Sequence, residues 1–190
     1  VMLLPWAIDA LRGPGGPTVE VFSLDRKETM GEDCLSINVF TPATSGPRRS
    51  VMVWLHGGGY SSGSASWLLY DGSNLAHSED VVVVTVNHRL NVFGHLYLKD
   101  LGGDAYADSG NVGILDIVSV LEWVRDNIEN FGGDPDSVTI FGQSGGAGKV
   151  STLLGLPAAQ GLFHKAIAMS GAALASTPAA TATDTAERVL

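Results

Sequence analysis

The chain has 190 residues, of which 45% are hydrophobic and 16% are charged, as is typical of a globular protein that buries a core. Its formal net charge of −9 at pH 7 argues against nucleic-acid binding, which requires a basic face. No apolar run approaches the roughly 20 residues of a membrane-spanning helix, so no membrane span is predicted.

The apolar segments predict an alternation of strands and helices. Residues 81–84 are four valines without polar alternation, which is typical of a strand covered on both faces of a parallel sheet. Apolar side chains recur at helical spacing over 111–130, and Phe131-Gly132-Gly133 then supplies a glycine signal for the helix end. Strands are expected at 35–40, 51–55, 81–87, 138–141 and 166–170, a loop at 43–50, and a second helix directly after Ser144. The Ala/Thr-rich tail, 172–190, shows no site, and whether it is ordered stays open.

A Gly-x-Ser-x-Gly motif extends from Gly142 to Gly146, within the sequence VTIFGQSGGAG. A β-branched strand precedes the motif and helix-compatible residues follow it, so Ser144 is expected on a sharp strand-to-helix turn with its hydroxyl exposed. The flanking glycines are needed because the turn brings the strand and helix backbones so close that a Cβ would clash. Ser144 is therefore the candidate nucleophile.

A second motif lies upstream, where residues 56–59 read HGGG directly after the apolar segment 51–55. In hydrolases with a nucleophile elbow, such a glycine run turns backbone N–H groups toward the carbonyl oxygen of the substrate. These donors stabilise the charge that develops on that oxygen, each by about 3 kcal/mol. An isolated glycine run would more simply be a tight turn, but its combination with the serine motif favours an oxyanion hole.

Together with further segments, these motifs resemble the carboxylesterase type B family, the group of esterases and lipases that includes the cholinesterases. Residues 32–42 (EDCLSINVFTP) look like the family's EDCL signature, and residues 131–146 fit its serine signature throughout. The segments NHRL at 87–90 and GNVGILD at 110–116 also match, with His88 in place of a tyrosine. The resemblance implies an α/β-hydrolase fold, with a mostly parallel sheet flanked by helices.

The resemblance begins around Trp6 and fades after Gly171. Family members are considerably longer, and their acid and histidine base follow the serine in the chain. Nothing after Ser144 supplies a convincing pair, because the only downstream histidine, His164, matches a structural segment of the family. Residues 1–190 are therefore expected to be the N-terminal part of a single α/β-hydrolase domain, with the acid, the histidine and the later strands beyond this chain.

By this resemblance, Ser144 is the nucleophile that forms an acyl-enzyme, and the N–H groups of Gly58, Gly59 and Gly145 form the oxyanion hole. Gln143 stands where the family has a glutamate, so a preference for cationic, choline-like substrates becomes doubtful. No cofactor and no metal are expected, because the histidines show no clustered ligand spacing. The expected partners are a small-molecule ester and the missing C-terminal part of the same enzyme.

Several other residues are expected to support the fold. His56 should orient the glycine run, and Arg89 and Asp116 match a structural ion pair of the family. Lys149, on the helix after Ser144, is expected to be solvated or to act as a helix cap. Cys34 is the only cysteine of the chain and is expected to be a buried thiol.

The main functional hypothesis is a serine carboxylic-ester hydrolase, of which this chain alone should be inactive. The alternative is a catalytically inactive fragment or a partner-binding module of the same family. Amide or thioester hydrolysis also stays open because it uses the same groups. The sequence does not determine the acyl and alcohol preference, the oligomeric state or the compartment. An exposed apolar edge is expected along the strand at 166–170, which later strands of the family would cover.

Overall fold

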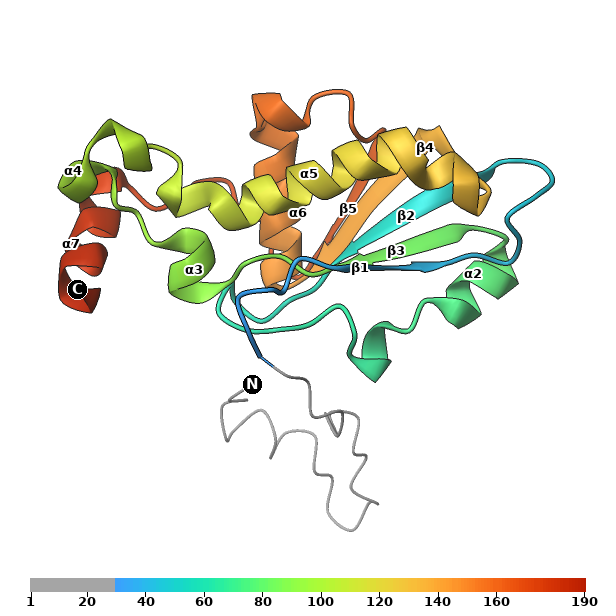
Figure 1. The fold of residues 1–190 in the computed structure, drawn as a ribbon, viewed down its shortest axis with the longest axis horizontal. Coiled ribbons are helices and arrows are strands. Elements are labelled where there is room, and N and C mark those ends of the chain that lie inside the picture. The colour runs from blue at the N-terminus through green and yellow to red at the C-terminus, as the bar shows by residue number, and fades with distance from the viewer. Residues whose placement is uncertain (1–29) are drawn as a thin grey trace, which may run out of the picture.

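The part of the chain that the computed structural model describes, residues 30–190, is built on a five-stranded sheet (Figure 1). The strands lie in the order β1-β3-β2-β4-β5. Strand β1 runs antiparallel to β3, and all other neighbouring pairs are parallel. The strands are β1 (Ile37–Phe40), β2 (Arg49–Leu55), β3 (Val82–Val86), β4 (Gly133–Gln143) and β5 (Lys165–Met169). The predicted mostly parallel sheet and each of its predicted strands are therefore confirmed.

Two strands begin at least two residues earlier than the sequence predicted. Strand β4 begins at Gly133 instead of residue 138, and β2 begins at Arg49, inside the predicted loop at 43–50. Arg49 pairs with Gly133, and the register then shifts before Val51 pairs with Val138. These added residues form no apolar pattern, and all of them except Gly133 are partly or fully exposed, so hydropathy carries no signal for the pairing of Arg49 with Gly133.

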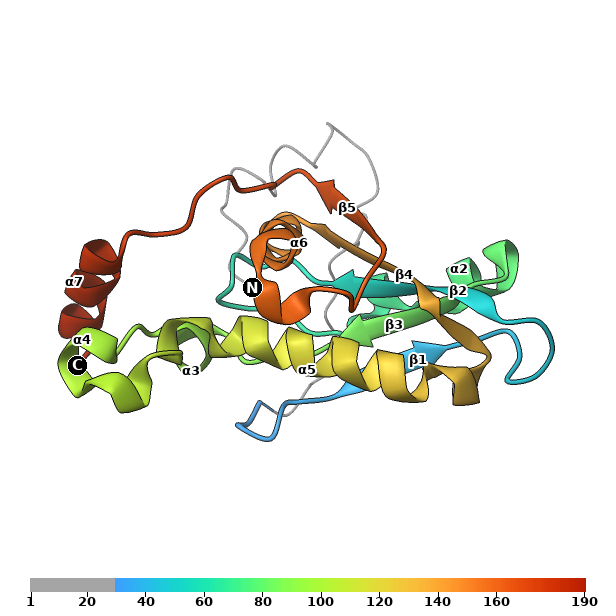
Figure 2. The same cartoon turned by 90° about the horizontal axis from the view of Figure 1, so that it is seen from above.

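One face of the sheet forms the hydrophobic core with α5 (Val112–Asn127) and α6 (Gly145–Gly155). Alternate residues of β2 and β3 point to this face, because the register pairs Val51 with Val82 and Val53 with Val84. Seen from above, α5 runs lengthwise beside the strands (Figure 2). The apolar side chains that recur at helical spacing are buried in this core, except that of Leu115, which is partly exposed. Their burial confirms the predicted helix.

The end of α5 follows the predicted glycine signal. One turn of 3-10 helix, η4 (Ile128–Phe131), continues α5, and Gly132 then adopts the left-handed conformation with φ +78°. A residue with a Cβ would be strained there. The turn leads directly into β4, which carries the serine motif at its other end.

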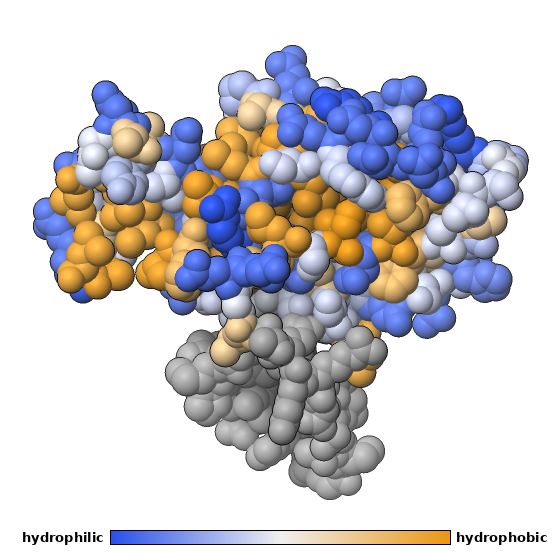
Figure 3. Space-filling view, in the orientation of Figure 1, coloured by the Kyte–Doolittle hydropathy of each residue, from blue (hydrophilic) through white to orange (hydrophobic). Residues whose placement is uncertain are grey.

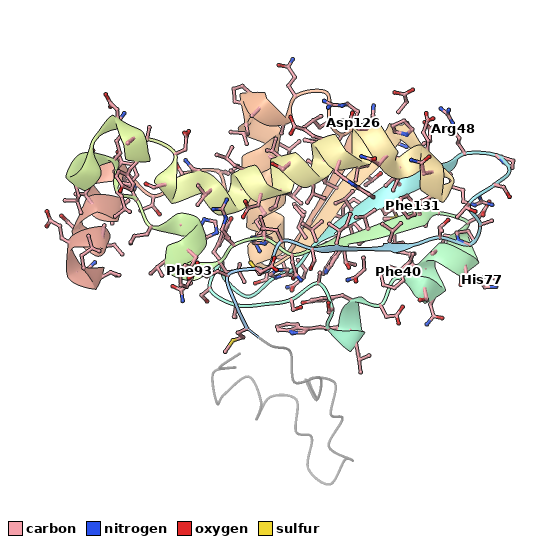
Figure 4. All side chains as sticks on the ribbon, in the orientation of Figure 1. Phe40, Arg48, His77, Phe93, Asp126 and Phe131 are labelled. Atoms are coloured by element: carbon pink, nitrogen blue, oxygen red, sulfur yellow. The ribbon has the colours of Figure 1, made fainter. Side chains whose placement is uncertain are left out.

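Helix α2 (Ser73–Glu79) and the short turn η1 (Leu68–Tyr70) lie near the opposite face of the sheet. A Cβ on Gly72, directly before α2, would lie within 2.9 Å of the Val83 side chain and 2.8 Å of Phe40. Figure 4 shows Phe40 on the side of the sheet toward α2. Helices α5 and α6 on one face and α2 on the other therefore make the layered arrangement of an α/β fold.

The remaining short elements connect the main ones. Helix α7, in the tail whose order the sequence left open, lies beside α4 at one end of the molecule, and the Thr183 hydroxyl donates to the Asp100 carboxylate over 2.6 Å (Figures 1 and 2). None of the other elements is long enough for a helical period to appear in the sequence. They are α3 (Asn91–His95), α4 (Lys99–Gly102), η2 (Asp104–Tyr106), η3 (Ser109–Asn111) and η5 (Pro157–Ala159), whereas α7 (Ala179–Val189) has 11 residues.

Apolar side chains reach the surface in several places, among them β5 and α3. All residues of the outer strand β5 are exposed, with Ile167 at 44% and Met169 at 37%, as the sequence analysis expected. Apolar surface also lies over α3, where Phe93, labelled in Figure 4, is 62% exposed (Figure 3). Within residues 30–190, no helix is both long and apolar enough to cross a membrane.

Candidate active site

Ser144 occupies the junction between β4 and α6 in an unusual backbone conformation. Its φ of 57° and ψ of −121° lie outside the regions that residues with a side chain ordinarily adopt. Two hydrogen bonds hold it there: its N–H donates to the Met169 carbonyl over 2.9 Å, and its carbonyl accepts from the Gly148 N–H over 3.2 Å. The residue is exposed. The sharp turn predicted for the serine motif is therefore present.

The glycines around Ser144 are required by close backbone contacts. A Cβ on Gly146 would lie 2.0 Å from the Leu55 carbonyl oxygen, and one on Gly142 would lie 2.6 Å from the Gly146 backbone. A Cβ on Gly171, after β5, would lie 2.3 Å from the Ser144 carbonyl oxygen. Backbone atoms cannot move aside for an added Cβ as the end of a flexible side chain can. These three contacts therefore require glycine at each position.

The glycine run at 57–59 lies next to the serine turn because of the strand register. Strands β2 and β4 are parallel neighbours, and Leu55 at the end of β2 pairs with Gly142. The two following loops therefore leave the sheet at the same edge, where binding sites of parallel sheets form. A Cβ on Gly145 would lie 2.8 Å from the Gly59 nitrogen, so the two motifs are in direct backbone contact.

The glycine run has a conformation that only glycine adopts easily. Gly58 and Gly59 have φ values of +97° and +61°. The Gly58 carbonyl accepts the N–H groups of Ser61 and Ser62 over 3.1 and 3.2 Å, which points this carbonyl into its own loop. Gly59 is exposed and Gly58 partly so. The structure thus brings together all four residues that the sequence analysis named for catalysis: Ser144, Gly58, Gly59 and Gly145.

A buried pair of stacked imidazoles lies beneath the glycine run. His56 is completely buried, and its ring stacks on that of His88 with centroids 4.9 Å apart. His56 Nδ1–H donates to the Gly57 carbonyl over 2.7 Å, because a carbonyl can only accept. Burial and the nearby Lys149 charge lower the pKa of His56 to about 4 and that of His88 to about 2, so both are neutral at pH 7. His56 therefore supports the glycine run as an uncharged group, in keeping with the structural role expected for it.

Lys149 is not solvated as the sequence analysis expected, and it is not a helix cap. Its side chain is completely buried, and its ammonium group donates to the His56 carbonyl over 2.8 Å. The same group lies 5.4 Å from the centre of the Tyr60 ring. Burial lowers the pKa of Lys149 to about 7. Sequence reasoning missed this residue because a lysine on an amphipathic helix is normally solvated, and the sequence does not show that this one faces β2.

Other expected supporting residues take mixed positions. The Arg89 guanidinium and N–H both bind the Asp116 carboxylate, which is only 7% exposed, so the ion pair is present. His164 is structural, since its Nδ1 accepts the N–H of Val138 over 3.1 Å. Cys34 is only partly buried, contrary to the expected buried thiol, because it precedes β1 at the edge of the sheet.

No histidine or carboxylate among residues 30–190 forms a hydrogen bond with the Ser144 hydroxyl. In this part of the chain there is also no group of three or more histidine, cysteine or acidic side chains that could hold a metal ion. The described site therefore consists of an exposed serine, a run of glycine N–H groups beside it, and a buried polar cluster underneath.

Comparison with known proteins places this geometry among esterases. The model of the carboxylesterase family matches residues 13–189. Para-nitrobenzyl esterase of Bacillus subtilis is 52% identical over 146 residues, which are 77% of this chain and 29% of that protein. Acetylcholinesterase of Electrophorus electricus is 50% identical over 159 residues, which are 83% of this chain and 24% of that protein.

A solved structure gives the same result. The crystal structure of a Geobacillus stearothermophilus carboxylesterase matches with a TM-score of 0.81 and 50% sequence identity, covering 86% of this chain and 34% of that chain. The chain thus spans about a quarter to a third of the length of these relatives.

Proposed function

The chain belongs to the carboxylesterase family, and on this premise we propose that its protein hydrolyses carboxylic esters through an acyl-enzyme formed on Ser144. The Ser144 oxygen attacks the ester carbonyl carbon, and its proton passes to a histidine base. That histidine then protonates the leaving alcohol, and a water molecule hydrolyses the acyl-enzyme. The histidine and its acid partner are contributed from beyond this chain, in the order serine, acid, histidine.

One observation carries the proposal: the direct contact between the serine turn and the glycine run. A Cβ on Gly145 would lie 2.8 Å from the Gly59 nitrogen, so the backbone after Ser144 and the backbone of the glycine run adjoin at one edge of the sheet. We assign the N–H groups of Gly58, Gly59 and Gly145 to the oxyanion of the tetrahedral intermediate. Donors held in place before the reaction stabilise that charge without having to reorganise.

The strained backbone at Ser144 supports the same assignment. Conformations of this kind cost about 1–3 kcal/mol and persist only where the surroundings enforce them. Here the surroundings include Gly142, Gly146 and Gly171, which would all clash if they had a Cβ. The result is a serine hydroxyl at the surface on a rigid support. Gln143 beside it is uncharged, so we expect neutral esters to be preferred over cationic ones.

The test compares hydrolysis of p-nitrophenyl butyrate by the full-length protein that contains this chain with hydrolysis by its Ser144→Ala variant. We expect the variant to lose at least about three orders of magnitude in kcat, as for a removed nucleophile. Ser119→Ala, an exposed serine on α5, is the matched control and should retain full activity. Activity that survives Ser144→Ala would refute the proposal. The 190-residue chain alone is expected to be inactive, because it lacks the base.

A further inference from the structure

We propose that Lys149 is a positioning residue of the oxyanion hole, whose buried ammonium group holds both ends of the glycine run against the helix that follows Ser144. The inference rests on the function proposed above and adds to it a residue that contacts neither the substrate nor the reacting atoms. Lys149 acts through His56 and Tyr60, the residues directly before and after the glycine run.

The contacts of Lys149 connect α6 with the end of β2 and with the loop that contains the glycine run. The side chain starts from α6, five residues after Ser144, and reaches beneath the glycine run to the end of β2. There its ammonium donates to the His56 carbonyl over 2.8 Å, which fixes the entry into the run. The face of the Tyr60 ring lies 5.4 Å from the same nitrogen, in the range of a cation–π contact, which holds the exit.

Tyr60 needs such support because its own backbone is strained. Its φ of 64° is uncommon for a residue with an aromatic side chain. The ring is held by an edge-on contact with His95, centroids 5.2 Å apart, and its hydroxyl lies where a Cβ of Gly148 would come within 2.6 Å. Gly148 precedes Lys149 on α6, so the lysine and the glycine dock the same helix turn onto the same tyrosine.

Among residues 30–190, no carboxylate forms a salt bridge with Lys149. Asp116, the carboxylate that acts on the neighbouring His95, is bound by Arg89. The imidazoles that face it are neutral at pH 7, because burial lowers the pKa of each below its usual value. The titratable and charged groups around the lysine are His56 after β2, His88 after β3, His95 on α3, Tyr60 in the loop, and Asp116 on α5 with its partner Arg89.

An unpaired ammonium is a costly group to bury, and an apolar side chain would fill the same space with less penalty. What the ammonium adds is a charged hydrogen bond to the His56 carbonyl, about twice as strong as a neutral one, and a positive charge beneath the place where the oxyanion forms. Both contributions are full only while the lysine is protonated. Because burial lowers the pKa of Lys149 to about 7, activity should decline as pH rises above that value.

The experiment measures kcat and KM for p-nitrophenyl butyrate from pH 5.5 to 9 in the full-length protein and in two variants. Lys149→Met keeps most of the length of the side chain and removes the charge, whereas Lys149→Arg keeps a charge that does not titrate in this range. Lys99→Met, which removes an exposed lysine on α4, is the matched control. Thermal unfolding of each variant verifies that it is folded.

We expect Lys149→Met to lower kcat at pH 6.5 at least about tenfold with KM changed less than about twofold, since a displaced oxyanion donor weakens the transition state more than the ground state. The alkaline decline of kcat should be present in the wild type, absent in Lys149→Met, and shifted beyond pH 9 in Lys149→Arg. Lys99→Met should match the wild type throughout.

Three results would overturn the inference. One is a kcat for folded Lys149→Met equal to that of the wild type. Another is a loss of kcat with an unchanged pH profile, which would mean that the lysine only supports the fold. If Lys149→Met does not fold, the wild-type profile still decides: a histidine base is already deprotonated above pH 7, so a flat kcat from pH 7 to 9 contradicts the inference. None of these affects the proposed function, which fails only if Ser144→Ala stays active.

Discussion

Replacing Gly146 with alanine should disrupt the candidate site more than any other change of one methyl group in α6. A Cβ at this position would lie 2.0 Å from the Leu55 carbonyl oxygen, whereas ordinary contact begins at about 3.4 Å. The atom that it meets is backbone of a central strand, so α6 and β2 would have to separate by about 1.4 Å. The resulting overpacking should cost about 3 kcal/mol, which more than offsets the gain of about 1 kcal/mol in helix propensity.

The same separation should carry the Gly145 N–H away from the glycine run, and a displacement of about 1 Å lowers catalysis roughly 100-fold. The matched control is Gly155→Ala at the end of α6, where a Cβ would meet nothing within 4 Å. We expect Gly146→Ala to lower the Tm of the full-length protein by about 2 °C and to lose most of the esterase activity, with both quantities unchanged or slightly raised in Gly155→Ala. Equal Tm and kcat for the two variants would show that the contact with Leu55 does not hold the elbow.

Three further predictions concern the rest of the fold. Asp116→Asn should lower the free energy of unfolding by about 2–3 kcal/mol in chemical denaturation, because it breaks a largely buried ion pair whose arginine is 40% exposed. The control is Asp126→Asn on the surface, which should leave the denaturation midpoint unchanged. An Asp116→Asn variant as stable as the wild type would contradict the structural role of the pair. Burial lowers the pKa of His88 to about 2, so below pH 6.5 this histidine binds a proton in the unfolded chain but stays neutral in the folded one. The free energy of unfolding should therefore fall as pH drops, by up to about 1.4 kcal/mol per pH unit. Tm measured from pH 4 to 7 should show this decline, and the decline should be weaker in His88→Tyr. If Tm depends on pH equally in the wild type and in His88→Tyr, His88 does not cause the decline. The 190-residue chain alone should self-associate in size-exclusion chromatography through β5, and Ile167→Lys should reduce association while Leu174→Lys, outside any strand, should not.

Much of the fold could be predicted because its core elements obey simple periodicities. Three of the four valines before residue 85 lie in β3, in which every residue is buried, and the apolar positions of α5 face the sheet almost without exception. The predictions were less complete where a strand extends beyond its apolar residues, as in the first five residues of β4. They also missed α7, whose Ala/Thr-rich sequence has no apolar face wide enough to indicate a helix.

The candidate site divides in the same way. Ser144 and the glycines could be identified because close backbone contacts and positive φ values require glycine, and the glycines therefore appear as motifs in the sequence. Lys149 could not be identified, because its burial depends on which face of α6 packs against β2 and on the depth of the space under the glycine run. His88 was noted only as a replacement for tyrosine, and its stacking on His56 follows from two strands being neighbours.

The serine turn and the glycine run are held in place in different ways. A mutation can therefore disturb one of them without disturbing the other. The turn at Ser144 is enclosed by backbone atoms of β2, α6 and the segment after β5, so no single side chain maintains it. The glycine run is more exposed, contains two residues with positive φ and is followed by a third, and is fixed from below by the buried lysine. Truncating Lys149 should therefore loosen the oxyanion donors while leaving the serine turn in place. Hydrolysis that depends on both the serine turn and the glycine run would slow, and the fold around the nucleophile would persist.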